Sequence, residues 1–494
     1  MRTIKFLCLF LLVPAVVYAA EDQDIRLRLE QDLLQQTSER QQALQAQQQL
    51  DQLPVMVING ENMVVSHNIH DLGHGLYVAI MQKQWQAARI YLAHYEQLAS
   101  YDAALAQFAH GALARAQGER DTAEQYFHQA LKLQPENLMI QLELARLFTE
   151  QQKNQAAQQI FIQVKEKLLE NKSPSSVPIL NTVDIYLKGL EQREAWQGTL
   201  SLGIRHASNI NSSSEKSSSW IRYAQDAEGN QIPVEQVTRQ TDKAIIADGL
   251  DYEATFNKRW SLDGQHGVLF KGFAYGRSYD EHANYNEMTF NLNAGYSYQT
   301  PQNQILLAPV FEHRRYQNQS LSNAWGARAE WLHIINPSAA LKLEAEAKEI
   351  TNRQYANQSG DEYAAFATLW KTLPQQWTLF AGVDAVDHRS EEQYFTAYQQ
   401  MGIRFGISKK FDSGLHTTLF SAVRWRDYAK YNAVLEDQRR DFEQNYTLLI
   451  SAPQWQFYGI TPNMMYQYHH NKSNVDWLYS YQKSNLSLKL DYRF

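Results

Sequence analysis

The sequence contains almost no cysteine: among 494 residues there is one, Cys8. A scaffold built on disulfides and a metal site built on thiolates are therefore excluded. We expect Cys8 to lie inside a secretory signal peptide, residues 1–19, in which a basic start precedes an apolar core. A lipid anchor at Cys8 is the alternative, but it would need an apolar segment ahead of the cysteine. Cleavage after Ala19 would deliver a chain without cysteine to the periplasm or beyond.

Long apolar runs and an excess of basic residues are also lacking. Beyond the signal segment no apolar run reaches about 18 residues, which excludes membrane-spanning helices. A transmembrane β-barrel stays possible, because its strands only alternate in hydrophobicity. The chain carries 46 Lys and Arg against 53 Asp and Glu, for a formal net charge of −7. We therefore expect no nucleic-acid partner.

Motifs that carry chemistry are missing too. We find no phosphate-binding loop, no metal-ligand spacing and no nucleotide site, and the 15 histidines are scattered. The pair His469-His470 falls in a predicted outer loop, where we expect solvated side chains. We therefore expect no enzyme activity, no catalytic residue, no cofactor and no metal site.

Aromatic residues are abundant but unevenly placed. Between residues 21 and 194 the only tryptophan is Trp85, and the other ten of the eleven lie from Trp196 onward. We divide the chain into a signal peptide at 1–19, a glutamine-rich helical segment with a linker at 20–60, a helical domain at 61–194 and a strand-rich domain at 195–494. In the second segment, apolar residues at helical spacing predict a solvated amphipathic helix; these are Ile25, Leu29, Leu33 and Leu34.

The helical domain contains an internal repeat. Small residues, an aromatic and a proline follow the spacing of a tetratricopeptide repeat at Gly111, Ala123, Phe127, Ala130 and Pro135. The same template without its proline follows 34 residues later at Ala145, Ala157 and Phe161. A weaker copy precedes both, at Ala79, Ala88, Leu92 and Tyr95. We expect the small residues to let paired helices approach and the aromatic to fill the gap; an unrelated helical bundle is the alternative.

From Trp196 onward the periodicity changes from helix to strand. In 339–348, for example, Ala and Leu at odd positions alternate with Lys342, Glu344, Glu346 and Lys348. Fourteen such segments, an even number, predict a 14-stranded antiparallel transmembrane β-barrel. The predicted fold class is α + β in two domains, an N-terminal α-helical tetratricopeptide-repeat array followed by this C-terminal barrel. Mixed lumen-facing charges, which include Arg328 and Glu330, predict a solvated interior.

The connections between the predicted strands alternate in length. Residues 207–246, 352–360, 429–439 and 469–478 form long connections, whereas 261–265, 374–375 and 452–453 form short ones. Outer-membrane barrels have short periplasmic turns and longer outer loops. We therefore place every long connection outside the cell. The first strand then starts in the periplasm, so the repeat domain lies there as well.

The last strand ends in an aromatic residue after alternating apolar positions. These positions are Leu486, Leu488, Leu490, Tyr492 and Phe494. We expect them to form a signal that the barrel-assembly machinery reads. Tryptophans near the ends of the predicted strands are expected to lie at the lipid interface.

The order of signal peptide, short repeat array and fourteen-strand barrel resembles the surface lipoprotein assembly modulator (Slam) family. The segment that begins at Trp196 is similar to the opening of that family's barrel domain, where an Asn-x-Asn, here Asn209 and Asn211, follows the first strand. The resemblance covers nearly the whole mature chain. It implies an outer-membrane translocator that exports or displays a client protein, either a surface lipoprotein or a soluble haemophore-like protein, with the periplasmic repeats as the client receptor.

Two other functions remain open on the sequence alone. One is a polysaccharide exporter, although such proteins usually carry longer arrays and a lumen of one dominant charge sign. The other is a nutrient porin with a periplasmic repeat scaffold. For the translocator, the expected partners are a secreted or surface-anchored client protein, the barrel-assembly machinery and outer-membrane lipid, with no nucleic acid.

Overall fold

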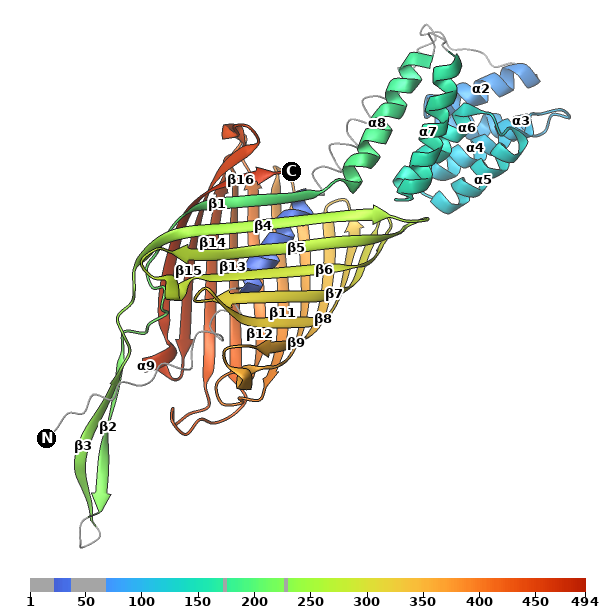
Figure 1. The fold of residues 1–494 in the computed structure, drawn as a ribbon. Helices are drawn as coiled ribbons and strands as arrows, with labels where there is room; N and C mark the ends of the chain where they lie inside the picture. The colour runs from blue at the N-terminus through green and yellow to red at the C-terminus, as the bar shows by residue number, and fades with distance from the viewer. Residues whose placement is uncertain (1–21, 37–67, 172–175, 226–229) are drawn as a thin grey trace.

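The computed structural model describes residues 22–36, 68–171, 176–225 and 230–494. It shows a helical array, a closed β-barrel, and a helix formed by residues 22–36 that lies inside the barrel (Figure 1). The predicted signal peptide and residues 37–53 of the predicted glutamine-rich helix lie outside the described residues. Among the residues that the structure describes, no helix is both long enough and apolar enough to cross a membrane.

The array consists of helices that pack as antiparallel pairs. They are α2 (Ile69–Met81), α3 (Trp85–Tyr95), α4 (Ala103–Ala116), α5 (Arg120–Leu133), α6 (Leu138–Glu150), α7 (Asn154–Asn171) and α8 (Val177–Glu194). The first helix of each pair begins after an Asn or Asp whose side chain accepts a backbone N–H, and these caps are Asn68, Asp102 and Asn137. The predicted repeat is therefore confirmed as three helical pairs, and α8 follows as an additional helix.

Close approach within a pair depends on small residues facing an aromatic ring. A Cβ atom added at Gly111 would lie 2.7 Å from ring carbons of Phe127, so only glycine fits at this crossing. Phe127 itself is completely buried, as are Ala123 and Ala130 on the same helix. The structure places Ala145, Ala157 and Phe161 in the equivalent, fully buried positions of the next pair. Pro135 lies between α5 and α6, where its carbonyl accepts a hydrogen bond from the Gln141 side chain at 2.6 Å.

The barrel closes through fourteen antiparallel strands in sequence order, with β16 paired to β1. Closure leaves no free edge. Its strands are β1 (Gln197–Ala207), β4 (Ala247–Ser261), β5 (His266–Tyr279), β6 (Glu287–Gln299), β7 (Asn303–Tyr316), β8 (Gln319–Asn336), β9 (Ala339–Asn352), β10 (Gly360–Leu373), β11 (Trp377–Ser390), β12 (Tyr398–Lys410), β13 (His416–Tyr428), β14 (Arg440–Ser451), β15 (Ile460–Ser473) and β16 (Tyr481–Arg493). The predicted strand number and fold class are confirmed.

Polar residues face the inside of the barrel and apolar residues face outward. On β9, Lys342, Glu344 and Glu346 are buried, whereas Leu343 is 39% exposed on the outer surface. On β16, Leu488 is 51% exposed while its neighbour Lys489 is 3% exposed. Each strand thus presents an apolar face outward, where lipid would surround it, and a polar face to the lumen.

We call the end of the barrel where α8 leads into β1 the array end, and the opposite end the hairpin end (Figure 1). At the hairpin end the predicted long connection 207–246 contains a two-stranded ribbon, β2 (Ser217–Gln225) and β3 (Gln231–Gln240), which projects from the barrel. The alternation of the strands did not predict this ribbon, which falls within a connection expected to be a long loop.

The predicted alternation of connection lengths is wrong at two places. At the hairpin end, β7 and β8 are joined by Gln317 and Asn318 alone, both with positive φ, as a tight hairpin turn requires. At the array end, the strand predicted to start at 454 begins at Ile460 instead, after a one-turn 3₁₀ helix at Pro453–Trp455. Trp455, predicted at a strand end, therefore lies in this turn.

Candidate functional site

The barrel lumen is occupied by the helix of residues 22–36, which we call the lumen helix (Figure 1). Its residues 23–30 are all buried. The Asp22 carboxylate contacts Arg314 near the hairpin end of β7, whereas the Gln36 amide donates to the Thr199 hydroxyl at 2.9 Å near the array end of β1. The helix therefore runs along the barrel from the hairpin end to the array end. The prediction of a solvated helix here is wrong.

The sequence of the lumen helix explains why both of its sides bind the wall. Charged residues occupy every even position from Asp22 to Asp32. At 3.6 residues per turn, Asp22, Arg26 and Glu30 share one face, and Asp24, Arg28 and Asp32 share the opposite face. The apolar stripe of Ile25, Leu29 and Leu33 is therefore narrow, with charges on either side of it. Such a helix suits a polar tube that surrounds it.

The first face bonds to strands β7 to β9. Arg26 donates to Glu346 of β9 at 2.9 Å. Glu30 accepts from Arg328 of β8 at 2.6 Å and from Lys342 of β9 at 2.8 Å. Together with the contact between Asp22 and β7, these ion pairs hold one side of the helix from Asp22 to Glu30.

The second face bonds to the opposite part of the wall. Asp24 accepts from Arg424 of β13 at 2.7 Å and from the Asn445 amide of β14 at 2.7 Å. Arg28 donates to Glu253 of β4 at 2.6 Å. Because the two faces contact strands on different sides of the barrel, the helix bridges the lumen.

Apolar side chains between the charges make two small contacts with the wall. Ile25 and Leu29 pack with Phe273 and Tyr275 of β5. Leu27 points to the other side and packs in a cluster around Phe366 of β10. Ion pairs and apolar contacts therefore both hold the helix in its position in the lumen.

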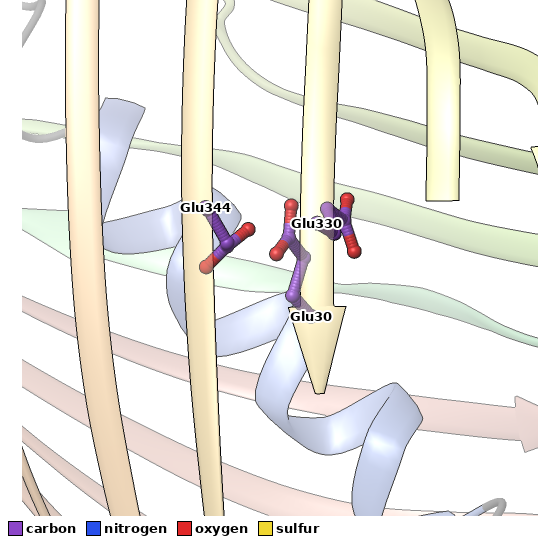
Figure 2. A group of neighbouring side chains, drawn as sticks. All are labelled: Glu30, Glu330 and Glu344. Carbon is purple, nitrogen blue, oxygen red and sulfur yellow. The ribbon is translucent and has the colours of Figure 1, made fainter. Parts of the chain in front are cut away.

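Three carboxylates meet where the helix approaches β8 and β9 (Figure 2). One oxygen of each of Glu30, Glu330 and Glu344 lies within 4.8 Å of the others. Each of these carboxylates contacts at least one cation at 3.0 Å or less, and the cations are Lys271, Arg328 and Lys342. Three negative charges are thus matched by three positive ones, and we assign the cluster to holding the helix. The charges predicted to face a solvated interior instead bond to one another and to the helix.

Two cavities flank the array-end half of the lumen helix. One of about 350 Å³ is lined by Arg28, Gln36, Thr199 and Glu253, among others. The other, of about 160 Å³, lies between Leu33 and the array, where Arg193 of α8 contributes to its wall. The lumen is therefore less tightly filled at the array end than around residues 23–30.

The array is seated on the rim of the barrel. The Asn154 amide at the start of α7 donates to the Ser261 hydroxyl at 3.3 Å, and the Gln265 amide donates to the carbonyl of Gln151 at 3.0 Å. Arg193 of α8 donates to the carbonyl of Thr149 at 3.0 Å. These bonds place the last repeat directly beside the array-end mouth of the lumen.

The structure places Asn209 and Asn211 at the base of the projecting ribbon. The Asn209 amide donates to the carbonyls of Ser213 at 2.9 Å and Gln482 at 3.0 Å. Asn211 donates to the carbonyl of Lys243 at 2.9 Å and accepts from the backbone of Ile245 at 3.0 Å. Asn209 therefore fastens the start of the connection to β16, and Asn211 joins the two ends of the connection to each other, which gives the Asn-x-Asn a structural role.

The residues of the predicted assembly signal lie on the seam of the barrel. The side chains that alternate along β16 point outward and are exposed, at Leu486, Leu488, Leu490 and Tyr492. The backbone of Phe494 exchanges hydrogen bonds of 3.1 and 3.2 Å with Gly198 and so completes the pairing of the last strand with the first.

The prediction that His469 lies in an outer loop is wrong. The residue lies on β15 with 4% of its surface exposed, and its ring contacts the Tyr481 hydroxyl at 2.8 Å and the Asn445 side chain. The predicted loop began too early, because β15 continues to Ser473.

Comparisons with known proteins agree with this architecture. A family model described as surface lipoprotein assembly modifier matches residues 196–494, and one for that family's N-terminal tetratricopeptide repeats matches residues 58–161. A protein of Acinetobacter baumannii named hemophilin secretion modulator is 49% identical over 100% of both chains. Surface lipoprotein assembly modifier 1 of Neisseria meningitidis is 24% identical over 89% of this chain and 86% of that protein.

Among solved structures, the outer membrane channel DcaP of Acinetobacter baumannii aligns with a TM-score of 0.35 and 10% identity, over 61% of this chain and 96% of that one. The family model for the barrel alone covers more than half of the chain, and the repeat model adds most of the array. On these matches, and on the fourteen-strand barrel with its apolar outer face, this outer-membrane protein belongs to the surface lipoprotein assembly modifier family, the family that its sequence resembles.

Proposed function

We propose that this protein is an outer-membrane translocator that carries a client protein from the periplasm to the cell surface or the medium. The observation that carries the proposal is the position of the repeat array, whose last repeat is bonded to the rim at the mouth of the barrel through Gln151 and Asn154. A receptor in this position delivers its cargo directly to the lumen or to the barrel wall. The proposal assigns no chemical reaction to the chain.

The names of the relatives suggest two classes of client. One relative is named a hemophilin secretion modulator and others are named surface lipoprotein assembly modifiers. Because the first of these shares 49% of its residues with this chain over the full length, we favour a soluble, haemophore-like client. A lipidated surface protein is the second class.

A polar surface shared by the repeats is our candidate for client contact. Arg115 of α4 bonds to Glu143 of α6 and, at 2.5 Å, to Glu150 of the same helix. Arg146 of α6 pairs with Glu143 and lies 5.7 Å from the ring centre of Tyr186 of α8. Charged and aromatic groups from three helices thus meet on one surface, which could bind the polar and aromatic groups of an extended chain.

The remaining partners follow from the barrel. Its apolar outer face requires lipid, and its last strand carries the pattern that we expect the barrel-assembly machinery to read. The two alternative functions, nutrient porin and polysaccharide exporter, are not favoured, because an ion-paired helix fills the lumen instead of leaving an open channel.

Co-expression with a defined client tests the proposal. The probe is hemophilin, produced in a laboratory strain of bacteria that has no protein of this family, with and without this chain. We expect hemophilin in the medium only when this chain is present, and equal amounts inside the cells in both cases. A strain that carries the variant Arg146→Glu in place of the parent chain should export less, whereas a strain with the exposed control Lys132→Glu on α5 should not. Export that is unchanged by the presence of this chain would contradict the proposal for this class of client.

A further inference from the structure

We propose that the lumen helix is a resident plug, which closes the barrel between export events and leaves the lumen when a client passes. The closing of the barrel rests on geometry alone. The release during export rests on the proposed function, so the two parts need separate tests.

Closure follows from the contacts of the helix on both of its faces. Residues 23–30 are buried, and their charged side chains reach β8 and β9 on one side and β4 and β13 on the other. At the hairpin end Asp22 adds a contact with Arg314 of β7. Over this stretch the helix spans the lumen, so removing it would open a polar passage through the membrane.

Release is possible because the wall can neutralise its own charges. Besides its bond to the helix, Arg328 contacts two carboxylates of the wall itself, Glu344 at 2.8 Å and Glu330 at 3.0 Å. Lys342 contacts Glu344 at 3.0 Å as well. When the helix leaves, both cations therefore keep carboxylate partners on the wall.

The opposite part of the wall shows the same arrangement. Arg424 contacts Asp384 at 3.3 Å, and Glu253 accepts from Lys489 at 2.7 Å. Back on the first side, Glu346 of β9, the partner of Arg26, also contacts Lys348 at 3.3 Å. Breaking a buried ion pair is strongly destabilising when the remaining charge is left buried without a partner. Because each of these wall residues has a second partner, departure of the helix leaves none of them unpaired.

The two ends of the helix differ in a way that gives release a direction. Asp32 and the residues Leu34 to Gln36 are only half-buried, and both cavities lie beside this half of the helix. The same half faces the array, which is the side from which a client would arrive. A client segment that enters at this end would displace the weakly held half first and the buried half, residues 23–30, afterwards.

The first experiment measures closure and needs no client. The full chain and a variant lacking residues 22–36 are reconstituted in planar bilayers of phosphatidylethanolamine and phosphatidylglycerol, after heat-modifiability confirms that both barrels are folded. We expect a steady ion conductance from the variant that the full chain lacks. Equal, low conductance from the two folded barrels would overturn the proposal. If the deletion does not fold, the full-length variant Glu30→Gln with Asp24→Asn removes charge from both faces of the helix and should raise the frequency of openings; unchanged openings would equally overturn it.

The second experiment measures release. The predicted mature chain contains no cysteine, so the pair Leu27→Cys and Ala364→Cys, two members of one apolar cluster, can be bridged by a short, reducible thiol reagent. The control pair Ala364→Cys and Val386→Cys links two facing residues of the wall and leaves the helix free. We expect bridging of the first pair to stop the export of hemophilin and reduction to restore it, while bridging of the control pair has no effect. Continued export with the helix bridged to the wall would overturn release. Failure of the parent chain to export hemophilin would instead count against the proposed function, and the conductance experiment would still decide whether the helix closes the barrel.

Discussion

At the scale of single residues, the repeat positions show what local spacing can predict. Gly111 and Phe127 occupy matched places on neighbouring helices, and a side chain at the first would collide with the ring of the second. Such a contact lies within one repeat, so its two members recur at a constant separation that the sequence displays. The wall residues that bind the lumen helix do not recur at a constant separation from it in the sequence. Arg26 and Glu346, for example, are 320 residues apart.

Phe127→Ala should strongly destabilise the array. The ring is completely buried, and truncating a buried Phe to Ala costs about 3–5 kcal/mol because a cavity remains. The thermal loss of the helical circular-dichroism signal of the full chain measures this effect. Leu133→Ala on the same helix is the control, since Leu133 is 55% exposed and should change the unfolding temperature little. Equal effects of the two variants would contradict the packing that we describe.

Glu143 should make the array sensitive to acid. Burial alone would raise the pKa of Glu143, but the guanidinium groups of Arg146 and Arg115 outweigh burial and lower the pKa below its ordinary value of 4.5. A carboxyl with a lowered pKa contributes stability that is complete above the pKa of the unfolded chain and is lost as the pH falls through the lowered value. Stability of the array should therefore fall below about pH 4.5.

The variant Glu143→Gln isolates this effect. It should lower the unfolding temperature of the array at neutral pH and make the decline below pH 4.5 shallower. The exposed Glu119→Gln serves as the matched control and should leave both properties close to those of the parent chain. A parent and a Glu143→Gln variant with the same pH profile would show that this ion pair does not stabilise the array.

At the scale of elements, strands were easier to predict than the turns between them. Alternation of polar and apolar residues extends over each strand and so tolerates errors in single positions. A turn depends on one or two residues: Gln317 and Asn318 adopt positive φ and make a two-residue connection at the end of the barrel where long connections were predicted. The lumen helix was predicted as a helix, but its place was missed. The charge at every even position from Asp22 to Asp32 was the available signal, since it places charges on two opposite sides of the helix and leaves only a narrow apolar stripe between them.

The orientation of the barrel can be tested at its two ends. Ser217 begins the projecting ribbon at the hairpin end, whereas Pro374 lies in the turn between β10 and β11 at the array end. Because the array is expected in the periplasm, an epitope inserted beside Ser217 should be labelled by antibody on intact cells, and one at Pro374 only after permeabilisation. The reverse pattern would place the array outside the cell.

The last residue should matter for assembly. Phe494 exchanges two backbone hydrogen bonds with Gly198 and completes the alternating outer face of β16. Deleting Phe494 should therefore slow insertion and reduce the amount of heat-modifiable barrel in outer-membrane fractions. Phe494→Tyr, which keeps an aromatic end, is the control. Normal amounts of folded barrel after the deletion would show that this end is not read during assembly.

At the scale of the whole molecule, the sequence was sufficient for the order of parts but not for their contacts. Repeat spacing and strand alternation identify an array followed by a barrel, since each pattern is local. The seat of the array on the rim and the helix within the lumen depend on bonds such as that between Asp24 and Arg424, 400 residues apart. Mixed charge inside the barrel is compatible with either water or a charged helix, so the charges alone did not distinguish a solvated lumen from an occupied one.

The central claim is that the array receives a client and the barrel carries it across the outer membrane. The most direct test deletes residues 72–194 and follows hemophilin, or the secreted product of a neighbouring gene, in cells that make the shortened chain. Heat-modifiability of outer-membrane fractions first establishes that the barrel is folded and as abundant as in the parent. We predict a normal amount of folded barrel and no client at the surface or in the medium. Client export at the parental rate from the barrel without its array would contradict the account.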